Sequence, residues 1–259
     1  MKKIVISIFN DAFVHYAIRM YTSYRFFDKK TQLYAGSLNL NLENIKKIES
    51  IGVKVLKSKT GFIPKNLCVC DLTIKDFVED LDYDSIMWID ADTIILRPIN
   101  HIFDLPYDFI GHGGDVEKGI FLFKRKRSWL SREIINDNLV EKNKWGNHYA
   151  MGLWVANKKQ IINDFYKLII KNKNLWYEGD ACSEIINQKF SNLQLNGFEW
   201  SLGTRQAKDI FYKNNIVFYK TNDRLYMPYQ FGYSRLDSGE RPICKAIESF
   251  YKNKILRIL

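Results

Sequence analysis

The first sixty residues alternate between short apolar runs and longer amphipathic segments. The β-branched run at 3–9 ends in polar residues and predicts a strand, and the apolar and aromatic spacing of 13–27 predicts a helix. The pattern then predicts a strand at 32–35, a helix at 41–51 and, after a helix-stopping glycine, a strand at 52–56. Strands and helices that alternate in this way predict an α/β fold with a mostly parallel, Rossmann-like central sheet flanked by helices.

The run 85–89 is apolar throughout and is typical of a buried strand. It stops abruptly at Asp90-Ala91-Asp92, and a second apolar run at 93–96 follows directly. Later apolar or periodic segments predict a helix that closes at 77–81, strands at 119–123 and 151–156, and a helix at 159–170. The chain has no internal repeat and no low-complexity linker, so we expect residues 1–259 to form a single domain.

The composition of the chain shows an excess of basic residues. The 259 residues contain 39 Lys plus Arg and 29 Asp plus Glu, a formal net charge of +10, and 46% of them are hydrophobic, which argues against disorder. The charge fits nucleic acid, an anionic membrane surface or a phosphorylated small molecule. Four cysteines without a C-x-x-C pair indicate reduced thiols, and neither a signal peptide nor a membrane span is recognisable, so we expect a cytoplasmic protein.

Asp90 and Asp92 are the residues that most clearly carry chemistry. In extended geometry, side chains two residues apart point the same way, so both carboxylates are expected to converge on one cation. A divalent metal that prefers oxygen ligands would compensate two charges at the rim of a buried strand. The alternative is that Asp90 caps a helix and Asp92 is a turn residue, each satisfied by backbone N–H groups.

The segment Trp88-Ile89-Asp90-Ala91-Asp92-Thr93-Ile94-Ile95 resembles the D-x-D core of GT-A fold glycosyltransferases, especially family eight and its relatives. The resemblance implies transfer of a sugar from a nucleotide-sugar donor, such as a UDP-sugar, whose diphosphate is held through Mn²⁺ or Mg²⁺. It implies that Asp92 is the firm metal ligand and that Asp90 shares the metal or reaches the donor ribose or sugar. Residues 1–110 would bind the donor and 111–259 the acceptor.

Two later segments match the family more weakly. Residues 145–157 resemble a turn into a strand beside the donor sugar, where Gly152 would allow close backbone approach; an ordinary buried strand with a glycine bulge is the alternative. In 176–184 the resemblance implies an acidic residue at the reacting carbon, with Asp180 the better match and Glu178 the other. In an inverting enzyme one of these would be the catalytic base, whereas Asp180 could instead cap a helix that starts at residue 181.

The mouth of the first strand is where the family holds the nucleotide. By position, Phe9, Asn10, Asp11 and Ala91 would lie around the base, ribose and diphosphate, and Tyr16 would stack on the base or simply pack on the sheet. The chain departs from family eight in having no histidine after His148 to serve as the third metal ligand. Asp223, water or, less directly, His112 could take that place.

The basic run 124–127 would suit an anionic membrane, and a lipid-linked glycan acceptor would make such peripheral contact useful at the inner face of the cytoplasmic membrane. The alternative, which the pattern favours, is a solvated turn between a strand and a helix. The sequence therefore predicts a metal-dependent glycosyltransferase of bacterial surface polysaccharide or lipooligosaccharide synthesis that does not bind nucleic acid. The rivals are a non-catalytic basic module that binds nucleic acid or membrane, and a nucleotidyltransferase on a similar fold.

Overall fold

A computed structural model describes most of the chain. The described residues are 1–113, 149–173, 175, 179–195, 197–200, 202–203, 209–214, 216–221, 224–232 and 247–256. The expected strand at 119–123 and the basic run 124–127 lie outside them.

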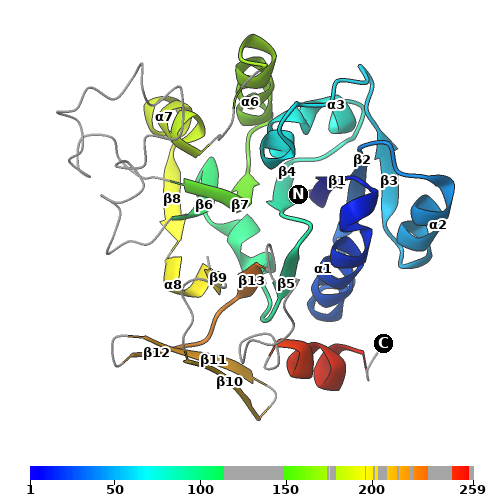
Figure 1. The fold of residues 1–259 in the computed structure, drawn as a ribbon. Helices are drawn as coiled ribbons and strands as arrows, with labels where there is room; N and C mark the ends of the chain where they lie inside the picture. The colour runs from blue at the N-terminus through cyan, green and yellow to red at the C-terminus, as the bar shows by residue number, and fades with distance from the viewer. Residues whose placement is uncertain are drawn as a thin grey trace.

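The amino-terminal part of the chain winds strands and helices in turn, as Figure 1 shows in blue and cyan. Strand β1 pairs in parallel with β2 on one side and with β4 on the other, and β3 pairs in parallel with β2. The elements here are β1 (Lys3–Phe9), α1 (Val14–Phe27), β2 (Gln32–Ser37), α2 (Leu42–Ser50), β3 (Lys54–Lys57), α3 (Lys75–Val78), β4 (Ser85–Ile89) and β5 (Thr93–Ile95). Short 3-10 helices cover Asp11–Phe13, Leu67–Thr73 and Asn100–Asp104.

The rest of the chain completes the central sheet and adds two small ones. The described central sheet has the order β3-β2-β1-β4-β7-β6-β8, in which only the pairs that involve β7 are antiparallel. The further elements are β6 (Phe109–Gly113), β7 (Tyr149–Ala156), α6 (Lys159–Lys171), α7 (Gly179–Lys189), β8 (Asn192–Leu195), α8 (Gly197–Trp200), β9 (Leu202–Gly203), β10 (Asp209–Lys213), β11 (Ile216–Thr221), β12 (Arg224–Tyr226), β13 (Gln230–Gly232) and a π-helix at Tyr251–Ile255. The mostly parallel α/β sheet expected from the sequence is confirmed.

Helices cover both faces of the central sheet and give the core two layers. On one face, α3, α6 and α7 pack with alternate residues of β1 and β4 and with the segment Leu67–Thr73. On the other face, α1 and α2 pack against the intervening strand residues. A third cluster joins β5, β13 and the carboxyl-terminal helical turn below the sheet (Figure 1). Burying alternate strand residues on opposite faces makes β1 and β4 rigid supports for whatever follows them.

Several element boundaries differ from those expected. Helix α2 ends at Ser50, and Gly52 adopts φ +78° just beyond it, as expected for a stopping glycine. Helix α3 ends at Val78, earlier than the expected closure at 81, because Glu79 to Leu81 form a turn in which the Leu81 N–H donates to the Val78 carbonyl. Helix α7 begins at Gly179, so Asp180 lies in its first turn, and the alternative that it caps a helix starting at residue 181 is wrong.

Candidate active site

The strand order puts the candidate site where the chain changes direction across the sheet. From β1 the chain moves outward through β2 and β3 and then returns to β4 on the opposite side of β1. The carboxyl ends of β1 and β4 therefore flank a topological switch point, where ligands bind in open α/β sheets. Asn10 follows β1 and Asp90 follows β4, so both residues lie at this edge.

The two aspartates of the D-x-D motif lie in a turn and not in an extended strand. Strand β4 ends at Ile89, and the Thr93 N–H donates to the Asp90 carbonyl at 3.1 Å, which closes a turn before β5. The Asp90 N–H donates to the Gly152 carbonyl at 2.8 Å and ties this turn to β7. The expectation that an extended strand aligns the two carboxylates is therefore wrong. Asp92 is a turn residue, as the alternative interpretation of the motif predicted.

Asp90 is half-buried at the end of β4. The indole N–H of Trp88 donates to its Oδ1 at 2.9 Å. Burial, followed by the negative charge of Asp92, raises the pKa of Asp90 to about 7, and the Trp88 hydrogen bond opposes this rise. Asp92 is itself buried, at 8% exposure. The two carboxylates thus act on each other at close range, and a cation would relieve their repulsion.

Gly152 lies opposite Asp90 on β7, and its lack of a side chain makes this arrangement possible. A Cβ atom at residue 152 would lie 3.0 Å from Asp90 Oδ2 and 3.4 Å from His112 Nε2. His112 is buried on β6 at 4% exposure. The structure therefore brings His112 beside the D-x-D turn, and any larger residue at 152 would push against both side chains.

Asp71 is a further acidic residue at the site, and the sequence interpretation overlooked it. It lies in the 3-10 segment Leu67–Thr73, at 3% exposure. Burial, followed by the negative charge of Asp90, raises the pKa of Asp71 well above its ordinary range, and the indole of Trp154 opposes the shift only in part. The available signal was one carboxylate inside the apolar run Val69-Cys70-Asp71-Leu72.

A metal centre made wholly of protein ligands is not present in the described part of the chain. Among these residues, no three His, Cys, Asp or Glu side chains are arranged to hold a metal ion. Asp90 and Asp92 supply hard oxygen ligands of the kind that Mn²⁺ and Mg²⁺ use. A cation there needs further oxygen ligands from a bound diphosphate, from water or from outside the described residues, and Asp223 is one candidate that lies outside them.

Residues at the mouth of β1 are engaged with the protein. Phe9 is buried and packs against the ring of Tyr21, with 6.4 Å between centroids. The Asn10 side chain accepts a hydrogen bond from the Ala12 N–H at 3.1 Å. Asp11 accepts hydrogen bonds from the Asn44 side chain and from the backbone N–H and side chain of Asn41, and these bonds lower its pKa. Contact of Phe9, Asn10 and Asp11 with a nucleotide stays a prediction.

The remaining predicted residues are less closely defined. Tyr16 is half-buried and lies beside Phe13, with 6.0 Å between ring centroids. Asp180 lies on α7, and Glu178 lies outside the described residues. Their role as catalytic base stays a prediction. In the described ranges, no helix has the length and apolar character needed to cross a membrane.

An aromatic cluster lies beside the residues that follow β5 and belongs to the same core layer as Ala91. Trp200 and Tyr229 stack at 4.0 Å, and the Arg97 guanidinium lies 3.9 Å from the centre of the Tyr229 ring. Arg97 also donates to the Met227 carbonyl at 2.7 Å. These contacts attach the carboxyl-terminal segment to the residues that follow β5, and they give the aromatic residues near 229 a packing role.

Comparisons with known proteins bear on the fold. No protein-family model matches the sequence, and no curated protein matches it. A structure of the galactosyltransferase LgtC with donor and acceptor sugar analogues aligns with a TM-score of 0.61 at 11% identity, over 96% of this chain and 94% of that one. The chain has the GT-A glycosyltransferase fold. The bifunctional glycosyltransferase WbbM aligns with a TM-score of 0.60 at 15% identity, over 98% of this chain and 51% of its own.

The GT-A fold agrees with the fold class expected from the sequence. The order of the strands places the D-x-D turn at the middle of the central sheet. Strand β4 is the central strand of the seven in the described sheet. The turn that follows it therefore has β1 on one side and β7 on the other. Both the backbone bond to Gly152 and the indole bond from Trp88 hold Asp90 at this position.

Proposed function

We propose that this protein is a glycosyltransferase that moves a sugar from a nucleotide-sugar donor to a glycan acceptor. The observation that carries the proposal is the pair Asp90 and Asp92 at the end of β4, opposite a glycine that leaves room beside them. The GT-A fold supports the reaction class. The donor and acceptor sugar analogues bound to LgtC support the pair of substrates.

Asp90 and Asp92 would hold a divalent cation, Mn²⁺ or Mg²⁺. Bound there, the cation would neutralise the charge that develops on a nucleoside diphosphate leaving group as the glycosidic bond breaks. Trp88 fixes the rotamer of Asp90 through its indole N–H, and Gly152 fixes the backbone of the turn. Both contacts keep the carboxylates oriented before the donor arrives, so little reorganisation is needed on binding.

The finer parts of the function follow from the sequence. We propose a UDP-sugar donor bound near Phe9, Asn10, Asp11 and Tyr16. Asp180 or Glu178 would act on the acceptor hydroxyl as the base of an inverting reaction. The basic run 124–127 would attract an anionic membrane that carries a lipid-linked glycan acceptor, as in bacterial surface polysaccharide or lipooligosaccharide synthesis.

Two other functions predict different ligands. A non-catalytic basic module would bind duplex nucleic acid or anionic vesicles with strong salt dependence and without need of a metal. A nucleotidyltransferase would release pyrophosphate from a nucleoside triphosphate. The paired, partly charged aspartates at the switch point favour a diphosphate bound through a cation over either alternative.

A thermal-shift panel tests the proposal. The protein is heated with UDP, UDP-sugars, nucleoside triphosphates and duplex DNA, each with Mn²⁺ and with EDTA. We expect UDP and at least one UDP-sugar to raise the melting temperature only with Mn²⁺, because a ligand that binds only the folded state stabilises it. Stabilisation by DNA alone, or equally by UDP with EDTA, would contradict the proposal.

A further inference from the structure

The small sheet formed by β10, β11 and β12 has one face toward the core and one away from it. Tyr212 and Val217 lie opposite each other in the register and pack with Phe250 in the third core cluster, where the Tyr212 and Phe250 rings meet edge-on at 6.1 Å between centroids. Because successive strand residues point to opposite faces, their neighbours along each strand point away from the core. These outward residues form the outer face of the sheet: Phe211, Lys213, Ile216, Phe218, Lys220 and Leu225.

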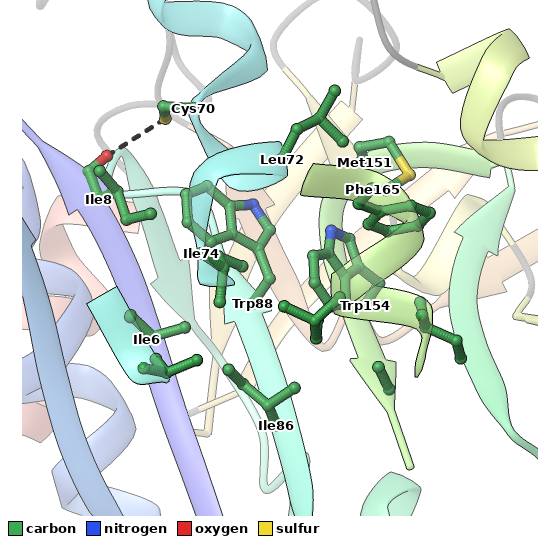
Figure 2. Packing of buried hydrophobic residues seen from close by; sticks show 14 of the residues in the cluster. Ile6, Ile8, Cys70, Leu72, Ile74, Ile86, Trp88, Met151, Trp154 and Phe165 are labelled. Carbon is green, nitrogen blue, oxygen red and sulfur yellow. Dashed lines mark hydrogen bonds between the residues drawn. The ribbon is translucent and has the colours of Figure 1, made fainter. Parts of the chain in front are cut away.

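The centre of the outer face is apolar and open to solvent. The rings of Phe211 and Phe218, which pair across β10 and β11, stack with 5.4 Å between centroids at an interplanar angle of 18°. Phe211 is 42% exposed, and Leu225 on β12 is 56% exposed. The core aromatic residues Trp154 and Phe165 lie instead between the central sheet and its helices, as Figure 2 shows. Exposed apolar patches mark surfaces that bind another molecule or a membrane.

Two lysines flank the apolar centre. Lys213 lies opposite Ile216 at one end of the β10–β11 pair, and Lys220 lies opposite Leu225 of β12 toward the other end. Both lysines are exposed, and Asp209 at the start of β10 pairs with Lys220 in the register. A lysine lays its aliphatic stem along an apolar surface and keeps its charge at the edge. The outer face therefore combines exposed apolar side chains with a lysine on either side of them.

This chemistry fits an anionic lipid bilayer better than it fits other partners. Phenylalanine and leucine side chains enter the boundary between headgroups and acyl chains, and lysines beside them meet the lipid phosphates. A second copy of the chain docked face to face would bring the same lysines together, and like charges oppose such a contact. A glycan needs several amides, hydroxyls or carboxylates beside aromatic rings, whereas the places next to Phe211 and Phe218 are taken mostly by aliphatic residues and lysines.

The outer face is connected to the D-x-D turn through a short path. Residues 227–229 join β12 to β13, and β13 pairs with β5 so that Gly232 lies opposite Thr93, directly after the turn. The Arg97 guanidinium holds this connection through its hydrogen bond of 2.7 Å to the Met227 carbonyl. Figure 1 shows the small sheet at the end of the molecule, beyond β5 and β13. A bilayer bound to the outer face would therefore lie at a defined place relative to the candidate active site.

We propose that the outer face of β10, β11 and β12 is a docking surface for an anionic lipid bilayer. Phe211 and Leu225 would enter the membrane interface, and Lys213 and Lys220 would contact the lipid phosphates. The inference rests on the proposed function for the use of this contact, which is access to a lipid-linked glycan acceptor. It assigns membrane contact to a folded surface and not to the basic run 124–127 alone.

Vesicle flotation of the full chain tests the inference. The protein is mixed with vesicles of phosphatidylcholine and phosphatidylglycerol, or of phosphatidylcholine alone, in EDTA and without nucleotide, so that the result does not depend on catalysis. We expect wild-type protein to bind the anionic vesicles and to bind the neutral ones much less. Lys213→Gln combined with Lys220→Gln should weaken binding about 25-fold, because one lysine near an anionic surface contributes about fivefold to the partition coefficient.

A second variant removes the apolar part of the outer face. Phe211→Ser combined with Leu225→Ser should weaken binding to anionic vesicles at least about tenfold, because two apolar side chains no longer leave water on docking. Both substituted residues are exposed, so the melting temperature without vesicles should stay close to that of wild type. If this variant does not fold, the lysine variant, which removes no packed side chain, decides the question.

Two matched controls change the same kinds of residue elsewhere. Lys54→Gln combined with Lys57→Gln removes two exposed lysines of β3 and lowers the net charge by the same amount. Leu42→Ser combined with Ile63→Ser removes two apolar side chains that are 76% and 40% exposed. Both controls should bind anionic vesicles within about threefold of wild type, since charges far from the bound surface are screened by salt.

The outcomes separate the docking surface from the proposed function. An outer-face variant that binds anionic vesicles as well as its matched control would overturn the inference, as would a wild-type protein that does not bind them. The proposed function then stands if UDP with Mn²⁺ still stabilises the protein. A wild-type dimer that the outer-face variants convert to a monomer would make this surface an interface between copies and would also overturn the inference. If the vesicle results are as expected but UDP with Mn²⁺ does not stabilise the protein, docking is supported and the proposed function is wrong.

Discussion

Replacing Asp90 with asparagine should stabilise the metal-free protein while it destroys function. Burial and the charge of Asp92 raise the pKa of Asp90 from an ordinary 3.8 to about 7. The folded state therefore binds a proton that the unfolded chain has already released, and the wild-type protein loses stability as pH rises from about 4 to about 7. Asparagine carries no charge at any pH and can still accept the Trp88 hydrogen bond.

The size of the effect follows from the pKa difference. A difference of about 3 corresponds to about 4 kcal/mol at pH 8, where the carboxylate is fully charged in both states. At pH 5 the same linkage gives about 2 kcal/mol, because only part of the proton release has taken place. These values are ceilings, since the amide N–H groups also need partners. We expect a rise in melting temperature of about 3 to 10 °C at pH 8 and less than half of that at pH 5.

The assay is thermal unfolding in EDTA at both pH values, with Asp28→Asn as the control. Asp28 is buried, at 7% exposure, and burial alone would raise its pKa. Hydrogen bonds from the Thr31 side chain and the Lys30 N–H outweigh this effect, so the pKa of Asp28 is lowered. Its substitution should therefore destabilise the protein. A melting temperature of Asp90→Asn below wild type at pH 8, or a gain equal at both pH values, would refute the electrostatic account of the site.

Two further predictions concern the same turn. Gly152→Ala should lower turnover of a nucleotide sugar at least about tenfold, because its Cβ would lie 3.0 Å from Asp90 Oδ2 and a small misplacement of catalytic groups is costly. Gly232→Ala, where a Cβ meets nothing within 4 Å, should keep wild-type rates in the same steady-state assay. The affinity for Mn²⁺, measured by calorimetry with UDP, should fall by up to about tenfold for each pH unit below about 7, because protons compete with the metal for Asp90. An affinity that does not change from pH 5 to pH 8 would count against Asp90 as a metal ligand.

The periodicity of the sequence was sufficient to predict the layered sheet. Strands β1 and β4 are short apolar runs that are buried on both faces of the sheet. Runs of this length with polar residues at each end are typical of buried parallel strands. Boundaries were less well predicted where a turn and a helix compete for the same residues. Residues 79–81 form a turn after α3, so this helix ends earlier than expected. Helix α7 begins before Asp180, and such shifts of one or two residues at a helix end are common.

The candidate site was predictable only in part, for a physical reason. Asp90 and Asp92 are adjacent in sequence and follow an apolar strand, so their pattern is local and visible. Asp71 and His112 reach the same place through the pairing of distant strands and the packing of the Leu67–Thr73 segment, and no local pattern records that proximity. The extended geometry assumed for the D-x-D pair was wrong because the backbone bond between Thr93 and Asp90 closes a turn.

The central claim is that Asp92 enables metal-dependent sugar transfer, and one measurement tests it most directly. Wild-type protein, Asp92→Asn and the exposed control Asp104→Asn are incubated with Mn²⁺ and a panel of UDP-sugars, and the release of UDP is followed with and without glycan acceptors. We predict UDP release by wild type and Asp104→Asn that stops on adding EDTA, and a loss of at least about a hundredfold in a folded Asp92→Asn protein. Wild-type turnover by Asp92→Asn, with unchanged response to Mn²⁺, would contradict the account.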